Sequence, residues 1–74
     1  MSRLIRMDRT GHTTLAEWKA DDPDAVRRAR AVFREELDRG FFAVVSEGAG
    51  RAHQVRELPM DAPVVILRSP IAGG

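Results

Sequence analysis

The apolar positions of this chain fall into short runs among polar residues, interrupted once by a longer segment with helical spacing. The first run covers residues 4–7, and residues 13–18 form a second run that is rich in β-branched and aromatic side chains. Both patterns predict strands. Gly11 lies between them, where a tight turn needs a residue that tolerates positive φ. We therefore expect an N-terminal β-hairpin, with the single tryptophan, Trp18, packed in the core.

A helix is predicted after this hairpin. Asp22 is suited to cap the free N–H groups of a helix, and Pro23 fits its first position. Apolar residues then recur every three or four positions, at Val26, Ala29, Phe33 and Leu37. Gly40 follows, where a left-handed cap would end the helix. We expect one amphipathic helix of about four turns, and a solvated, ion-paired surface on its charged face, which includes Arg34 and Glu36.

Three more strands are predicted in the second half of the chain, at residues 41–45, 52–58 and 64–68. Turn-forming residues separate the first two, and a segment bracketed by Pro59 and Pro63 interrupts regular structure before the third. The last of these strands begins with four successive apolar residues. Strands of this kind lie inside a sheet, so we expect a central position for it.

The predicted element order is strand, strand, helix, strand, strand, strand, in one domain that spans residues 1–74. A single helix must bury its apolar stripe on one face of a sheet, which predicts an α+β fold with a mixed sheet of four or five strands. The first and last strands can be parallel neighbours at the centre of the sheet, because the helix provides the long connection that parallel strands need.

Composition limits the chemistry that this chain can perform. The 74 residues include no cysteine and two histidines, His12 and His53, which are far apart in the sequence and outside any metal-binding spacing. Ser46 and Ser69 have no motif that supplies a positioned base. We therefore expect a protein that is not an enzyme and that binds neither a metal nor a cofactor.

Charge and hydropathy limit which classes of partner and which cellular compartment we expect. A net charge of +1 is far from the concentrated positive charge of phosphate-binding surfaces, although the helix arginines leave a small nucleic-acid binder as a third hypothesis. No apolar run approaches the ~20 residues of a membrane span, and the first residues carry no export signal. We expect a cytoplasmic protein with no nucleic-acid and no membrane partner.

The last predicted strand runs into the sequence Ser69-Pro70-Ile71-Ala72-Gly73-Gly74. Pro70 removes a ladder donor and should stop the strand. The two glycines lack Cβ atoms, which makes the segment thin and free in its backbone angles. Residues 69–74 are therefore expected to form a flexible tail whose reactive group is the terminal carboxylate of Gly74.

This tail and the element order resemble those of the β-grasp, ubiquitin-like proteins. The tail is most similar to that of sulfur carriers, such as the small subunit of molybdopterin synthase and the thiamine-pathway carrier, which have a Pro-Pro-Val-Ala/Ser-Gly-Gly type of ending. Ser69 stands here for the first proline and Ile71 for the valine. Leu58 and Val64 match the carriers' entry to the last strand, whereas their intervening Gly-Asp turn is absent. A separate bacterial ubiquitin-like branch, which conjugates to proteins, stays open.

The resemblance implies that the chain is a carrier or modifier. A partner enzyme would consume ATP to adenylate the carboxylate of Gly74. Transfer would then carry either sulfur, as a thiocarboxylate delivered to a sulfur-accepting enzyme, or the chain itself to an acceptor protein. Gly73 and Gly74 would give access to the reacting carbon, and Ser69-Pro70-Ile71-Ala72 would dock into the activating enzyme.

An activating enzyme also needs a binding face on the folded domain, since ordering each tail residue costs roughly 1–2 kcal/mol of backbone freedom. Phe41 or Phe42 and Val45 are candidates for exposed apolar residues on such a face, and equally for the core. The alternative function is a noncovalent protein-interaction adaptor with a ubiquitin-like fold that makes no use of the tail.

Overall fold

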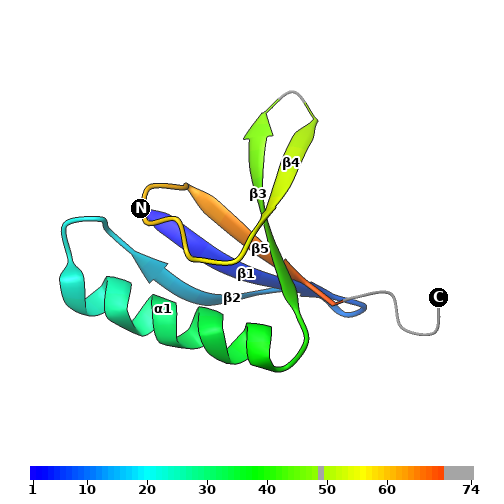
Figure 1. The fold of residues 1–74 in the computed structure, drawn as a ribbon, viewed down its shortest axis with the longest axis horizontal. Helices are drawn as coiled ribbons and strands as arrows, with labels where there is room; N and C mark the ends of the chain where they lie inside the picture. Colours follow the sequence, from blue (N-terminus) through cyan, green and yellow to red (C-terminus); the bar gives the residue numbers. More distant parts are fainter. Residues whose placement is uncertain (49, 70–74) are drawn as a thin grey trace.

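One helix and five strands follow one another in the order ββαβββ (Figure 1). The structure is a computed structural model that describes residues 1–48 and 50–69, with the backbone alone at 47 and 48. Its elements are β1 (Ser2–Asp8), β2 (Gly11–Trp18), α1 (Pro23–Asp38), β3 (Phe42–Gly48), β4 (Arg51–Val55) and β5 (Val64–Arg68). The predicted α+β class is confirmed, and the arrangement is β-grasp-like.

The five strands form one mixed sheet in the order β2-β1-β5-β3-β4. β1 and β5 run parallel, with Ile5 opposite Ile66, while the other neighbouring strands are antiparallel. β5 therefore has a partner strand on each side, which confirms its predicted central position. The parallel pairing of the first and last strands is confirmed as well, and α1 lies in the connection between them (Figure 1).

The signals that delimit α1 act as the sequence predicts. The Asp22 side chain accepts a hydrogen bond from the Ala25 N–H at 3.1 Å, and Pro23 is the first helical residue. Past the last turn, Gly40 has a φ of +101° and donates its N–H to the Leu37 carbonyl at 3.0 Å. A side chain at this φ would be strained, so glycine suits the point where the chain turns back to the sheet.

The core lies between α1 and one face of the sheet. Trp18 is 1% exposed, as predicted, and its indole N–H donates to the Met60 carbonyl at 3.1 Å. This bond joins the end of β2 to the loop at residues 56–63, so the loop closes one side of the core. The other buried apolar residues come from the helix, the three central strands and this loop: Leu4, Ala25, Val26, Ala29, Phe33, Ala43, Val45, Leu58, Val65 and Leu67.

Some expectations from the sequence are wrong in detail. The strand predicted at residues 41–45 spans Phe42–Gly48, so it continues into the segment that was expected to form the turn. The strand predicted at 52–58 ends at Val55, which pairs with Ala43. The partner strand β3 begins at Phe42, and the N–H of the preceding Phe41 donates to the Glu36 carbonyl rather than to a strand. Leu58 is 7% exposed and packs in the core rather than continuing the strand.

Glu36 does not belong to a solvated helix face. It is 4% exposed and accepts hydrogen bonds from the guanidinium groups of Arg6 and Arg39, each at 2.9 Å. It lies three positions after Phe33, on the stripe that faces the sheet. The carboxylate can occupy this position because two cations neutralise it. The predicted exposure of Arg34 is correct, but within the described residues Arg34 forms no ion pair.

Candidate functional site

The residues predicted to be activated lie at the end of the chain. Gly73 and Gly74, and residues 70–72 of the predicted docking segment 69–72, lie outside the described residues. Ser69, the first residue of the predicted tail, is described and exposed, directly after the last residue of β5. Ser69, the last described residue, therefore lies at the end of a central strand. This geometry makes the surface around the end of β5 the candidate functional site.

The sheet face opposite the helix carries an apolar surface in this region. Cross-strand partners point to the same face, and the central residues Ile5, Ile66 and Val44 are paired in register across β1, β5 and β3. Each of the three is half-buried. We name the sheet patch as the six apolar residues of this face on the three central strands: Ile5, Met7, Phe42, Val44, Val64 and Ile66.

The described part of the chain does not cover the sheet patch. α1 and the loop 56–63 both contribute to the core on the other face, where Leu58 packs with Phe33. Met7 is 38% exposed, and the remaining patch residues are half-buried by their neighbours in the sheet. A row of partly exposed apolar side chains on a small domain is typical of a surface that binds a partner.

The sheet patch reaches the end of β5 at Arg68. In register, Arg68 lies opposite Met7 on one side and Phe42 on the other. Arg68 is exposed and forms no ion pair within the described residues. At the opposite end, by contrast, Arg3 pairs with Glu17 at 3.3 Å. The end of the patch next to Ser69 thus presents an uncompensated positive charge beside apolar side chains.

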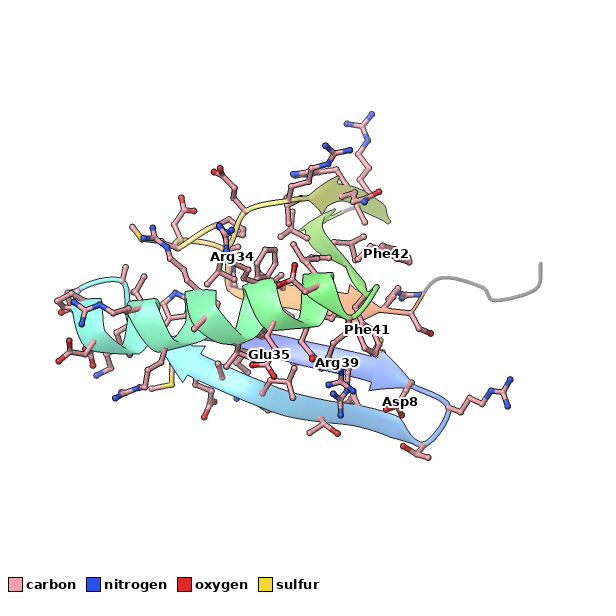
Figure 2. All side chains as sticks on the ribbon, turned by 60° about the horizontal axis from the view of Figure 1, so that its bottom comes forward. Asp8, Arg34, Glu35, Arg39, Phe41 and Phe42 are labelled. Carbon is pink, nitrogen blue, oxygen red and sulfur yellow. The ribbon has the colours of Figure 1, made fainter. Side chains whose placement is uncertain are left out.

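The three apolar residues proposed from the sequence have different positions. Val45 is 7% exposed and lies in the core. Phe41 also packs against the core, and its ring lies 5.8 Å from the Arg6 guanidinium carbon and 5.9 Å from that of Arg39. In Figure 2, Phe41 lies next to Arg39 at the end of α1, and Phe42 points to another side. Of the three, only Phe42 belongs to the sheet patch.

The turn beside this site is held by Asp8. The Asp8 carboxylate accepts hydrogen bonds from the Thr10 hydroxyl at 2.6 Å and from the Thr10 N–H at 2.9 Å. These bonds, with a smaller contribution from the Arg6 guanidinium, lower the pKa of Asp8 below its ordinary value of 3.8. The interactions fix the β1–β2 turn, which lies at the same end of the parallel pair as Arg68 (Figure 2).

The polar residues considered for catalysis are not gathered at one place. His12 is on β2 and His53 is on β4, which are the two edge strands of the sheet. Ser46 lies on β3 and Ser69 follows β5. Among the described residues there is no group of three or more His, Asp or Glu side chains that could hold a metal ion. No helix within residues 1–48 and 50–69 is long and apolar enough to span a bilayer.

Sequence reasoning missed most of the sheet patch. Ile5, Met7, Val44, Val64 and Ile66 were not singled out, although the unbroken apolar run at the start of β5 was the signal for two of them. That run places apolar side chains on both faces of the strand, and the structure covers only one face with a helix.

Comparison with protein-family models, with curated proteins and with solved structures gives no match to this chain.

Proposed function

We propose that this chain is a ubiquitin-like carrier or modifier whose C-terminal Gly74 carboxylate is adenylated by a partner enzyme in the cytoplasm. The observation that best supports the proposal is the position of the sheet patch, which ends at Arg68 beside the exposed Ser69. A protein that binds the patch would therefore also hold the point from which residues 70–74 extend.

The length of the segment sets a limit on this arrangement. Residues 69–74 reach at most ~20 Å when fully extended. An enzyme docked on the sheet patch must therefore have its nucleotide site within this distance of Ser69. Docking the rigid sheet first also raises the local concentration of the carboxylate at that site, which offsets part of the entropy lost when the tail is ordered.

The chemistry requires a carboxylate and a nucleotide. A free α-carboxyl group is ionised at neutral pH. One oxygen of the Gly74 carboxylate would attack the α-phosphorus of ATP, and pyrophosphate would leave. The resulting acyl-adenylate would then be attacked by a sulfur nucleophile, with AMP as the leaving group. Sulfide would give a thiocarboxylate, and an enzyme thiolate would give a thioester that can pass to an amine.

The proposal is tested by pyrophosphate exchange. The full chain, immobilised through its N-terminus, is used to enrich partners from a lysate of the native cells, and the eluate is assayed for exchange between ATP and labelled pyrophosphate. We expect exchange to require added full-length chain and to be lost when Gly74 is deleted. Exchange that continues unchanged with the shortened chain would refute activation at Gly74.

The two possible fates of the activated carboxyl are separated by a property of the composition. The chain has no cysteine, and residues 69–74 contain no methionine, histidine or lysine, so a thiol-reactive alkylating agent can modify this segment only at a thiocarboxylate. Alkylation matters because exchange of oxygen for sulfur changes the mass almost as much as oxidation of one of the three methionines. An alkylated C-terminal peptide indicates sulfur carriage, whereas an isopeptide adduct indicates conjugation.

The adaptor alternative is also supported by the sheet patch, because an apolar surface can bind a partner without any reaction at the tail. It predicts a different result in the same experiment. The enriched partner would bind equally well to a chain that lacks Gly73 and Gly74, and the eluate would show no exchange dependent on the chain.

A further inference from the structure

A concave surface lies on the helix side of the molecule. It is a groove of about 480 Å³ between α1 and the residues that follow β4. The helix contributes Arg30, Phe33, Arg34, Leu37 and Asp38, and the segment after β4 contributes Arg56, Glu57 and Leu58. In Figure 2, Arg34 lies on the side of α1 next to the segment that follows β4, and Glu35 lies on another side.

Three guanidinium groups line this groove without a carboxylate partner. Within the described residues, neither Arg34 nor Arg56 forms an ion pair, and Arg30 contacts the Met60 sulfur at 3.0 Å. Arg27 of the same helix, by contrast, pairs with Asp24 at 3.5 Å. Arg30 and Arg34 are one turn apart, where like charges repel. An anionic ligand would relieve this repulsion, so these three guanidinium groups are complementary to negative charge.

The floor and rim of the groove favour a peptide over a nucleic acid. Phe33 and Leu58 form the floor and are largely buried, while Leu37 is half-buried, so an apolar side chain could pack there. Asp38 and Glu57 also line the groove. Their carboxylates can accept hydrogen bonds from peptide N–H groups, which the sugar-phosphate backbone of a nucleic acid does not have.

We propose that this groove binds an acidic peptide segment of a partner protein, with an apolar side chain on the floor and carboxylates at Arg30, Arg34 and Arg56. The groove and the sheet patch lie on opposite faces of the sheet. The chain can therefore hold this partner while the sheet patch is occupied. The binding needs no reaction at Gly74 and does not depend on the proposed activation.

The test is a titration of the ¹⁵N-labelled full chain with a blocked probe peptide, acetyl-Asp-Glu-Phe-Asp-Glu-amide, at low salt. We expect a Kd below about 1 mM, with amide shifts concentrated at residues 30–38 and 56–58. A peptide with glycine in place of phenylalanine should bind more weakly. Higher salt should also weaken binding, because the arginines are exposed.

Matched variants locate the binding. Arg34→Glu and Arg56→Glu should each weaken binding of the probe peptide at least about fivefold. Arg28→Glu changes another exposed arginine of α1, outside the groove lining, and should alter the affinity less than about twofold. Thermal melting of each variant checks that it is folded.

Several results would overturn the proposal. These are a Kd above about 1 mM for the probe peptide, shifts concentrated on the sheet patch, an equal loss of affinity with Arg28→Glu, or tighter binding of a single-stranded oligonucleotide of the same charge.

Discussion

Replacement of Glu36 by alanine should destabilise this fold far more than the same replacement at its neighbour Glu35. The Glu36 side chain is 5% exposed and holds Arg6 and Arg39 at 2.9 Å each. The Arg6 side chain is 25% exposed, so loss of its charge-assisted bond should cost about 1.5–3 kcal/mol. The Arg39 side chain is 58% exposed, and water screening reduces its share to about 0.5 kcal/mol or less. We expect Glu36→Ala to lower the free energy of unfolding by about 2–3 kcal/mol.

This loss is a large fraction of the stability of a 74-residue domain, which is about 4–11 kcal/mol in total. It corresponds to a decrease in Tm of about 10–20 °C. Trp18 is the only tryptophan and is buried, so its fluorescence reports unfolding in urea and on heating. Glu35 is exposed, and Glu35→Ala should change the unfolding free energy by less than about 0.5 kcal/mol. Equal urea midpoints for the two variants would refute the role assigned to the Glu36 carboxylate.

Two further predictions concern the sheet patch and the β1–β2 turn. Val44→Lys should weaken binding of the partner enriched on the full chain by about tenfold or more. Ala31→Lys, on the exposed side of α1, should leave this binding unchanged. Equal binding by both variants would show that the sheet patch is not part of the interface. The pKa of Asp8 is lowered on folding, so its carboxylate contributes stability above 3.8 that is lost as pH falls through the folded pKa. The difference in unfolding free energy between wild type and Asp8→Ala should be constant from neutral pH to about pH 5 and should shrink in more acid solution; a difference that stays constant to the end of the acid range would contradict this.

Local signals in the sequence were sufficient for the elements of this fold. The Asp22 cap, Pro23 and Gly40 set the ends of α1 through contacts within a few residues, so each could be predicted without tertiary information. The apolar run of β5 predicted its central position for a similar reason. The predicted end of β4 was wrong, because a strand can pair only as far as its partner extends. That limit is set by where β3 begins.

The surfaces depend on tertiary contacts and could not be predicted in the same way. Glu36 is buried because Arg6, thirty positions away in the sequence, meets it across the core. The apolar side chains of β5 alternate between the two faces of the sheet, and the sequence alone does not indicate which face the helix covers. Arg56 was expected within a strand, and its place in the groove follows from the early end of β4.

Activation of Gly74 can be measured without knowing the partner enzyme. The full chain is incubated with native-cell lysate, ATP and hydroxylamine, which converts an acyl-adenylate to a hydroxamate. Trypsin then cleaves after Arg68, and the peptide 69–74 is examined by mass spectrometry. We predict a Gly74 hydroxamate that forms only with ATP and that is reduced by Val44→Lys but not by Ala31→Lys. Absence of the hydroxamate, or its formation without ATP, would contradict the proposed function.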